Sequence, residues 1–431
     1  MKPNIILIVV DALRKENLSC YGYKEKTSPN IDRLSEKSWN FNNSFSCINT
    51  TEPSMTSIMS GKCPSTHGII HQGTEKTKTD LKNSKYITLL PEILQSAGYK
   101  TFGFNWLQHW HKRGYDFYKG LVKKDTKKLK RKFGRFLDKI CKKIKNYQLK
   151  RFIYYMFIES DMNHTQNAKD KVNEAITHLE KINQSPFFLY LHFWDTHAPY
   201  KIPKKYKNKF KTKKNIQEKK LLNINPFIKN YIYNKIGQNK NLNEVYNRYN
   251  GAINYVDEQL GNLFSYLKKT HQYKDTLVII TADHGESINE HDIFFDHHGL
   301  YDVTIKVPLI ISYPNLLKYK MFNKFVQHTD LVPTIMDLLG KNYELDFDGN
   351  SLFKKIKRDS IFVEEYHTQK RRAIRTSNYK YIYSLTKNLK CRYCNRIHGD
   401  FEELYNLKKD PDELKNNNKK NPNLCKKLKN N

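Results

Sequence analysis

Four short, almost continuously apolar runs constrain the fold of this chain more than any other feature. They cover Ile5–Val10, Phe187–Phe193, Thr276–Thr281 and Pro308–Ser312, and they are rich in β-branched and aromatic side chains. Runs of this kind are typical of strands that are buried on both faces of a sheet. Segments with a helical period separate them, so the alternation predicts an α/β fold. We expect a large, mostly parallel central sheet flanked by helices on both faces.

The pattern changes after about residue 345. Short strand-like pieces follow at 360–366, 371–385 and 401–407, which predicts a small C-terminal α+β subdomain. We therefore divide the chain into a larger domain over residues 1–345 and a small subdomain over residues 346–431. The final residues are dominated by lysine and asparagine, so we expect the subdomain to end in a frayed tail.

The balance of charges favours anionic partners. The chain has 76 lysine and arginine residues against 43 aspartate and glutamate residues, a formal net charge of +33. Such an excess attracts anions. The alternative explanation is that the positive charge only reflects a general lysine-rich and asparagine-rich composition. We expect an anionic small-molecule, lipid-headgroup or glycan ester as substrate, and we do not expect nucleic acid as a partner.

Two basic insertions, at about 119–165 and 201–241, interrupt the alternation of strands and helices. The first has apolar side chains at helical spacing, at Leu129, Phe133, Phe136, Leu137, Ile140 and Ile144. This spacing predicts an amphipathic helix with a cationic face. It could contact an anionic membrane peripherally, cover the active site, or simply pack on the domain. The second insertion has no clear period, so we expect a mobile loop.

The cysteines indicate no disulfide framework. The chain has 7 of them, and a scattered, odd set does not suit a secreted disulfide scaffold. Cys391 and Cys394 form a single Cys-x-x-Cys pair near His398, which lacks a fourth ligand for zinc. The N-terminal residues lack a signal-peptide cleavage site, and no run of about 18 apolar residues occurs. We therefore expect a cytoplasmic protein.

Acidic and imidazole side chains follow three of the apolar runs directly. Asp11 follows the first run, and Asp283 and His284 follow the third. The carboxyl ends of parallel strands meet at one edge of a sheet, where ligands are bound. Adjacent carboxylate and imidazole groups are suitable ligands for a divalent cation, although an Asp after a strand more often only caps a turn. The second run contributes His192, Asp195 and His197.

A histidine-rich loop and a threonine supply further candidates. The loop EHDIFFDHHGLYD contains His291, His297 and His298. Packing alone does not explain three histidines in one short loop. In NTTEPSMTSIMSG, Pro53 suits the first turn of a helix, and a threonine just before it can act as a cap. A hydroxyl at a helix N-terminus also faces the positive end of the helix dipole, and coordination to a metal would make it a nucleophile.

With these motifs together, the sequence resembles the sulfatase family within the alkaline phosphatase superfamily over nearly the whole chain. PNIILIVVDALRKENLSCYGY resembles the opening strand with its metal-binding aspartate. TEPSMTSIMSGKCPSTHGI lies in the register of the nucleophile motif Cys-x-Pro-Ser-Arg. DTHAPY, TADHGES, HGLYDVTIKVPLII and HTDLVPTIMDLLG continue the series. The resemblance implies an alkaline-phosphatase-like fold and one divalent metal cation, with Mn²⁺, Ca²⁺ and Zn²⁺ as the candidates.

The resemblance also implies a role for individual residues. The implied metal ligands are Asp11, Thr51, Asp283 and His284. The implied catalytic residues are Thr51 as nucleophile, with His197 and His297 as acid/base and substrate-contacting groups. Further substrate contacts are expected from His298, Asp195 and Asn105. A second metal would need ligands such as Asp195, His197 and His328, but the Asp-x-His spacing does not match the two-metal branch of the superfamily.

Three departures from the family pattern affect the expected chemistry. Thr51 replaces the Cys or Ser that sulfatases convert to formylglycine, Met55 replaces the Arg, and Ala12 replaces a second Asp. A single opening Asp, a Thr and an Asp-His pair are together more similar to phosphonate-ester hydrolases and to phosphoglycerol or phosphoethanolamine transferases. An unmodified threonine sulfate has no aldehyde to re-form, whereas water or an alcohol can attack a phosphothreonine in line.

We therefore expect a metal-dependent hydrolase or transferase that cleaves phosphate-type or phosphonate-type esters, with diesters favoured, through a covalent Thr51 intermediate. One alternative is a sulfuric ester hydrolase that works without formylglycine. The other is a catalytically silent member that binds a polyanion or a membrane, which the retained Asp11, Thr51, Asp283 and His284 argue against.

Overall fold

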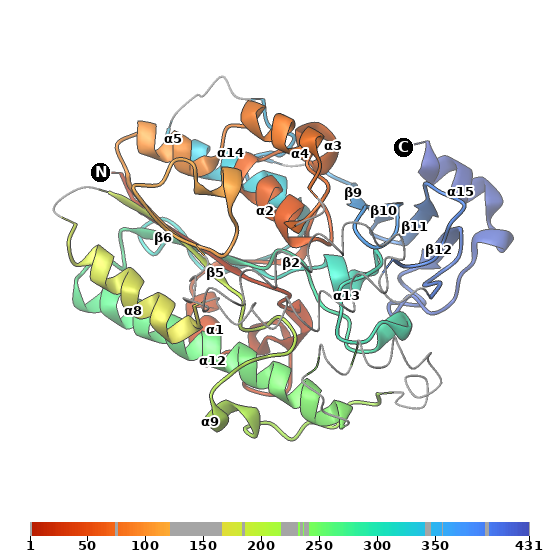
Figure 1. Cartoon of the computed structure of the whole chain (residues 1–431), viewed down its shortest axis with the longest axis horizontal. Helices are drawn as coiled ribbons and strands as arrows, with labels where there is room; N and C mark the ends of the chain where they lie inside the picture. Colours follow the sequence, from red (N-terminus) through yellow and green to blue (C-terminus); the bar gives the residue numbers. More distant parts are fainter. Residues whose placement is uncertain are drawn as a thin grey trace, which may run out of the picture.

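The computed structural model describes residues 2–73, 76–120, 166–182, 186–216, 232, 236, 241–340, 346–355, 357–392 and 396–430. Within them the largest element is an eight-stranded sheet with the order β4-β3-β5-β1-β6-β7-β2-β8 (Figure 1). Its strands are β1 (Asn4–Val10), β2 (Trp39–Phe45), β3 (Lys100–Phe104), β4 (Phe117–Lys119), β5 (Phe187–Phe193), β6 (Thr276–Thr281), β7 (Leu309–Ser312) and β8 (Lys320–Gln327).

The expected α/β architecture is confirmed, with one antiparallel strand. The four apolar runs form β1, β5, β6 and β7, and β1 pairs in parallel with both β5 and β6. β3 and β4 extend the parallel part beyond β5. β7 instead runs antiparallel to β6 and β2, because the chain returns after β6 through a loop and the short helix α13 (Asp302–Ile305) rather than through a long crossover helix.

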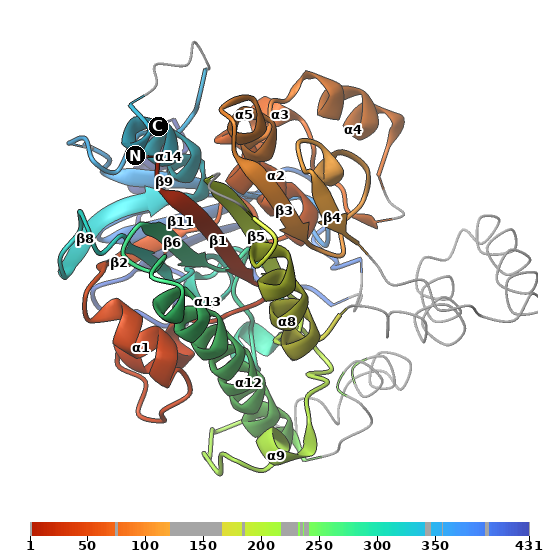
Figure 2. The same cartoon turned by 90° about the vertical axis from the view of Figure 1, so that its left-hand side faces the viewer.

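Two layers of helices cover the sheet, as Figures 1 and 2 show. The larger helices of one layer are α1 (Pro29–Ser35), α8 (Ala168–Leu179) and α12 (Leu242–Lys269). The other layer contains α2 (Thr51–Ser60), α3 (Pro64–His67), α4 (Lys78–Asn83), α5 (Leu90–Ser96) and α14 (Leu331–Leu338). Short 3₁₀ helices are η1 (Lys15–Asn17), η2 (Ser19–Tyr21), η4 (Ser84–Tyr86), η5 (His109–Lys112), η7 (Glu290–Asp292), η8 (His328–Asp330) and η9 (Asn418–Lys420).

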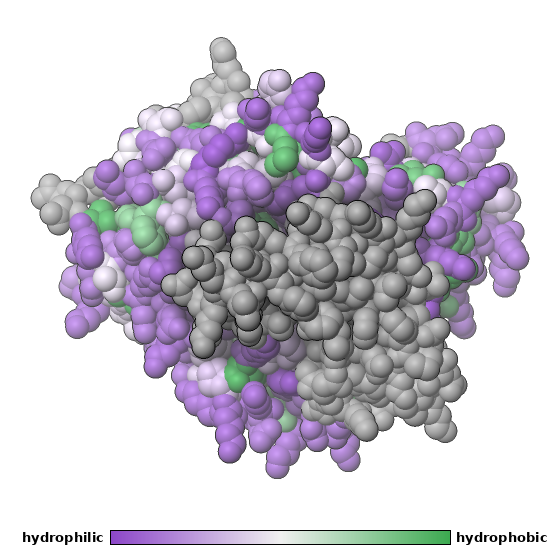
Figure 3. All heavy atoms as spheres, viewed as in Figure 1, coloured by the Kyte–Doolittle hydropathy of each residue, from purple (hydrophilic) through white to green (hydrophobic). Residues whose placement is uncertain are grey.

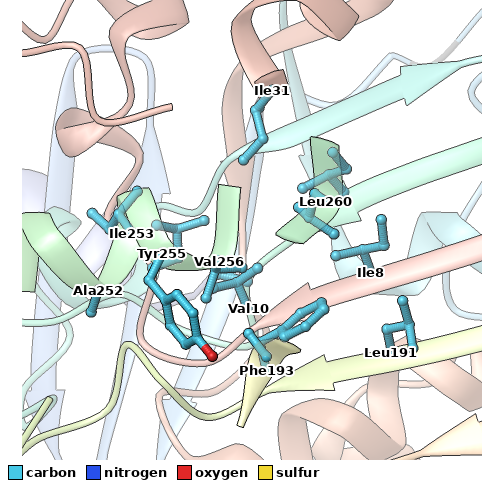
Figure 4. Close-up of a cluster of buried hydrophobic side chains, with 14 of the residues drawn as sticks. Ile8, Val10, Ile31, Leu191, Phe193, Ala252, Ile253, Tyr255, Val256 and Leu260 are labelled. Carbon is cyan, nitrogen blue, oxygen red and sulfur yellow. The ribbon is translucent and has the colours of Figure 1, made fainter. Parts of the chain in front are cut away.

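Alternation along the central strands divides the core between these two layers. Ile8 and Val10 of β1 face the α12 layer, where Val10 and Phe193 lie near Val256 (Figure 4). Ile5, Leu7 and Val9 of β1 belong instead to the core under α2 and α5. Side chains two residues apart share a face, so Asp11 follows Val9 onto the α2 side. The same alternation in β5 and β6 directs His192 and Asp283 to that side.

A second, antiparallel sheet follows with the order β12-β11-β10-β9, formed by β9 (Ser360–Glu365), β10 (Arg371–Thr376), β11 (Tyr379–Ser384) and β12 (Glu402–Asn406). It confirms the strand-like pieces of the C-terminal region. The expected frayed tail is wrong, because residues Pro422–Lys429 form α15. Cys425 and Leu428 of this helix are buried against the sheet, so apolar contacts hold a segment that its lysine content had suggested would fray. The division at residue 345 stays a prediction.

The predicted amphipathic helix of the first basic insertion lies outside the described residues. Of the second insertion, residues 201–216, 232, 236 and 241 are described. They include the short helix α9 (Lys204–Lys207), whose Tyr206 is buried against α12. Among the described helices, none is long and apolar enough to cross a membrane. On the face shown in Figure 3, the residues coloured by hydropathy are mostly hydrophilic, with small hydrophobic areas between them.

A buried ion-pair cluster connects the second sheet to the rest of the molecule. The Lys380 side chain of β11 is fully buried, and its Nζ lies 2.6 Å from Asp302 Oδ1 and 2.6 Å from Glu413 Oε1. We expect Lys380→Met to lower the free energy of unfolding by about 3–5 kcal/mol, because buried Glu413 loses its cation and Asp302 loses one of its cations, keeping Arg375 at 3.1 Å. Urea denaturation measures this change.

Lys205→Met is the matched control, since Lys205 pairs with Glu258 at the surface. It should leave the urea midpoint nearly unchanged. Equal effects of the two substitutions would contradict the role given to the buried cluster.

Candidate metal and nucleophile site

Asp11, Asp283 and His284 form a buried cluster at the carboxyl ends of β1 and β6. One ligand atom from each residue lies within 4.8 Å of the ligand atoms of the other two. All three side chains are fully buried. Their meeting follows from the parallel pairing of β1 with β6, which ends the two neighbouring strands at the same level. The structure therefore brings together three of the four predicted metal ligands.

Backbone groups orient the carboxylate of Asp283. Its Oδ1 accepts hydrogen bonds from the backbone N–H of Ala12 at 3.1 Å and of His284 at 2.9 Å. Its Oδ2 accepts no hydrogen bond from the described residues and lies 3.3 Å from His284 Nε2. Ala12 reaches Asp283 through a left-handed conformation, with φ of 55°. A backbone amide at Ala12 thus supports the site where the family pattern has a second aspartate.

His284 presents its Nε2 to the predicted nucleophile. Its Nδ1 donates a hydrogen bond to Gly285 O at 2.8 Å, so the neutral ring carries its lone pair on Nε2. This Nε2 lies 3.2 Å from Thr51 Oγ1, which completes the predicted set of ligands. Gly285 is needed next to His284, because a Cβ there would lie 2.1 Å from Val303 O.

Thr51 is the first residue of α2, and a hydrogen bond joins α2 to Asp283, which follows β6. The N-cap position is Thr50, but no side-chain hydrogen bond caps the helix. The possible capping role of these threonines is therefore not realised. Ser54, one turn into the helix, donates its Oγ–H to Asp283 O at 2.6 Å. Met55 is fully buried and its Sδ accepts a hydrogen bond from Tyr190 at 3.1 Å, so the position of the family's arginine has become part of the core.

The histidine-rich loop places His297 beside the cluster. Its ring stacks on the His284 ring, with centroids 4.0 Å apart. Its Nδ1 donates to Asn49 O at 2.6 Å, while Asn49 Nδ2 donates back to His297 O and to Gly299 O, each at 2.9 Å. Asn49 is buried and lies two residues before Thr51. This reciprocal pairing couples the nucleophile loop to the histidine loop.

His197 lies near His297, with ring centroids 6.4 Å apart. Its Nδ1 donates to Ala198 O at 2.8 Å, and its ring stacks on Trp194 at 3.9 Å. The structure thus gathers all three predicted catalytic residues, Thr51, His197 and His297, around the cluster.

His298, the residue after His297 in the histidine-rich loop, is buried. Its Nε2 lies 3.4 Å from Asp296 Oδ2, and its ring lies 5.9 Å from that of His398. Burial opposes a charged ring, but Asp296 and the neighbouring Cys391 thiol outweigh it and raise the pKa of His298 above its ordinary value. Of the Cys-x-x-Cys pair, Cys391 is a buried thiol beside His298, and Cys394 lies outside the described residues.

The other two predicted substrate contacts make structural hydrogen bonds. Asp195 Oδ1 accepts from the N–H of Ala168 at 3.2 Å, at the start of α8. Burial, opposed by Lys171, raises the pKa of Asp195 to about 6. The Asn105 carbonyl is engaged by His192 and by the backbone of Leu107. Their assignment as substrate contacts stays a prediction.

The cluster fits a divalent cation. Two carboxylates and an imidazole nitrogen are buried together. Buried carboxylates at this separation repel each other unless a positive charge lies between them. Oxygen and imidazole ligands suit Mn²⁺ and Zn²⁺, and oxygen ligands suit Ca²⁺. Asp11, Asp283, His284 and Thr51 are the residues that would hold the ion.

Comparisons with known proteins agree with this geometry. The sulfatase family matches residues 3–341, and the C-terminal family of N-sulphoglucosamine sulphohydrolase matches residues 289–431. The chain is 26% identical to an arylsulfatase of Clostridium perfringens over 96% of this chain and 90% of that protein.

Among solved structures, the phosphonate monoester hydrolase of Agrobacterium radiobacter is similar with a TM-score of 0.72 and 19% identity, over 98% of this chain and 93% of that one. A protein bound to its substrate D-glucosamine-2-N,6-O-disulfate is similar with a TM-score of 0.68 and 20% identity, over 100% of this chain and 96% of that one. At such identities the two structures establish the fold alone.

If the cluster binds a cation, adding Mn²⁺ to the metal-free protein should raise its melting temperature. A ligand at about 100 times its Kd stabilises the folded state by about 2.7 kcal/mol. Asp283→Asn should remove most of the shift, because it takes away one carboxylate charge. Differential scanning calorimetry measures both results.

Asp257→Asn is the control, since Asp257 is fully buried and its carboxylate accepts hydrogen bonds from Asn30 and Ile31 in the α1 layer. This variant should be less stable, yet it should keep the full Mn²⁺ shift. Loss of the shift in both variants would contradict the site.

Proposed function

Because the chain belongs to the sulfatase family, we propose that it is a metal-dependent ester hydrolase or transferase with Thr51 as its nucleophile. The proposed substrates are phosphate-type or phosphonate-type esters of an anionic molecule, with diesters favoured. The observation that carries the proposal is the position of Thr51, whose Oγ1 lies at the start of α2 and 3.2 Å from His284 Nε2.

The residues around Thr51 support its activation. A divalent cation held by Asp11, Asp283 and His284 would lower the pKa of the Thr51 hydroxyl and offset the negative charge of the ester oxygens. The N-terminal end of α2 adds the positive end of its dipole at the same point. Ser54 holds this helix against Asp283, so the hydroxyl is aimed before substrate arrives.

The covalent step follows from these positions. Thr51 Oγ1, whose proton has left to solvent, forms a bond to phosphorus as the bond from phosphorus to the leaving oxygen breaks. His297 enters as the imidazolium, with its Nδ1–H donated to Asn49 O, and gives its Nε2 proton to that oxygen. Water or an acceptor alcohol then attacks the phosphothreonine and gives its proton to His297, and Thr51 Oγ1 is released as the alkoxide from which it started. Protonated His197 contacts the non-bridging oxygens.

The chemistry of the intermediate favours phosphorus over sulfur. A threonine sulfate lacks the hydrated aldehyde through which formylglycine expels sulfate, whereas a phosphothreonine is open to in-line attack. The names of the relatives support the alternative, a sulfuric ester hydrolase that works without formylglycine. The net charge of +33 supports an anionic substrate in either case, and contact of the first basic insertion with an anionic membrane stays a prediction.

The decisive substitution is Thr51→Ala. With Mn²⁺ present, we expect the protein to hydrolyse 4-nitrophenyl phosphonates or phosphodiesters, and Thr51→Ala to lower kcat/KM by about 10³-fold or more, as loss of a nucleophile does. Thr50→Ala is the matched control, a neighbouring buried threonine without a side-chain cap bond. It should keep nearly all of the activity.

Rapid quenching of the wild-type reaction should reveal phosphorylated Thr51 by mass spectrometry. Turnover of 4-nitrophenyl sulfate alone would overturn the phosphorus assignment. Retained activity in Thr51→Ala would overturn the nucleophile. Absence of turnover on every ester, with tight binding to a polyanion, would support the silent alternative.

The role of His297 predicts a dependence on the leaving group. For alkyl esters, whose leaving oxygen needs a proton, His297→Ala should lower kcat/KM by about 10²-fold to 10⁴-fold. For 4-nitrophenyl esters, whose leaving oxygen is a weak base, the loss should be much smaller. Equal losses for the two series, measured at one pH, would show that His297 is not the proton donor.

A further inference from the structure

His192 is a buried imidazole at the metal cluster that the proposed reaction leaves without a role. It is the next-to-last residue of β5, paired with Val9 of β1, and it is fully buried. Its Nε2 lies 3.3 Å from Asp11 Oδ2 and makes no hydrogen bond to any of the described residues. A desolvated polar atom of this kind, aimed at a metal ligand, calls for a partner.

The hydrogen bonds of Asn105 determine which nitrogen of His192 carries the proton. His192 Nδ1 lies 2.7 Å from Asn105 Oδ1. The same Oδ1 accepts a hydrogen bond from the backbone N–H of Leu107 at 3.2 Å, so the oxygen and not the amide nitrogen of Asn105 faces the ring. Nδ1 is therefore the donor, and the lone pair of the neutral ring is on Nε2.

This arrangement sets a nitrogen lone pair against a carboxylate oxygen in a dry environment. Two electron-rich atoms at 3.3 Å repel each other unless a cation touches both. Adjacent ligands with bonds of about 2.1 Å to one ion are separated by about 3.0–3.4 Å, which matches this spacing. The other oxygen of Asp11, Oδ1, lies 3.9 Å from His284 Nε2. The group of ligand atoms that lie within 4.8 Å of one another is Asp11, Asp283 and His284, so a shared ion would draw the His192 ring toward that group.

We propose that His192 is a further ligand of the divalent cation, and that Asn105 is the positioning residue that keeps its Nε2 unprotonated. The inference rests on the metal dependence in the proposed function, but not on the identity of the nucleophile or of the ester. It gives Asn105 a role at the metal instead of at the substrate. Two imidazole nitrogens among the ligands favour Mn²⁺ and Zn²⁺ over Ca²⁺, which binds oxygen almost exclusively.

Isothermal titration calorimetry of the metal-free protein tests the proposal without substrate. His192→Phe removes both nitrogens and keeps a planar ring. It should weaken Mn²⁺ and Zn²⁺ binding at least about 10-fold and change Ca²⁺ binding much less. His111→Phe is the matched control, because His111 is a similarly buried imidazole in η5. It should leave all three affinities unchanged.

Pulsed EPR of the Mn²⁺-loaded protein counts the coordinated nitrogens directly. We expect two ¹⁴N couplings in the wild type and in Thr51→Ala, and one in His192→Phe. Asn105→Ala should keep the fold and weaken Mn²⁺ binding, and it serves as the second variant if His192→Phe does not fold. Thr51→Ala that loses activity but keeps both couplings separates this inference from the proposed nucleophile.

Three results would overturn the proposal. One is a single ¹⁴N coupling in the wild type. Another is an equal loss of Ca²⁺ and Mn²⁺ affinity in His192→Phe, which would make His192 a support for Asp11 instead of a ligand. The third is a stoichiometry of two ions per chain, which would place His192 at a separate metal.

Discussion

The mutual repulsion of two buried carboxylates, Asp11 and Asp283, is the constraint on which the rest of the site depends. They end adjacent parallel strands at the same level, so the sheet itself forces them together. Water cannot screen them there, and the cost of two such charges is met only by a cation or by hydrogen bonds. Asp283 receives two backbone N–H groups, and the imidazole of His284 adds a neutral ligand. A metal centre is the arrangement that satisfies all of these groups.

The other parts of the site are arranged around that centre by contacts between distant segments. Ser54 fastens the nucleophile helix to the backbone of Asp283, and Asn49 exchanges hydrogen bonds with the loop of His297. These contacts span more than 200 residues of sequence. They make the proposed nucleophile, the proposed acid and the proposed metal ligands one preorganised unit, which is what differential binding of a transition state requires. The conformational entropy of these side chains is lost on folding and not during the reaction.

The central strands and the convergence of Asp11, Asp283 and His284 were predictable because both depend on local pattern. An apolar run followed by Asp, or by Asp and His, indicates a strand end with ligands, and three such ends in a parallel sheet must converge. The reversal of β7 was not predictable, because a strand of either direction has the same composition. The helical tail was missed for another reason. Cys425 and Leu428 are stabilised by the sheet that they cover, and the surrounding lysines gave the stronger local signal.

By itself, the sequence determined which strands are buried on both faces, which side chains stand at their carboxyl ends, and that the nucleophile position holds a threonine. These are properties of neighbouring residues and of side-chain chemistry. Only the tertiary structure decided that Asn105 turns to His192, that His192 turns to Asp11, and that Asn49 joins two loops. The physical reason is that a hydrogen bond depends on atoms meeting within about 3 Å at a suitable angle, and one-dimensional spacing carries no information on that meeting.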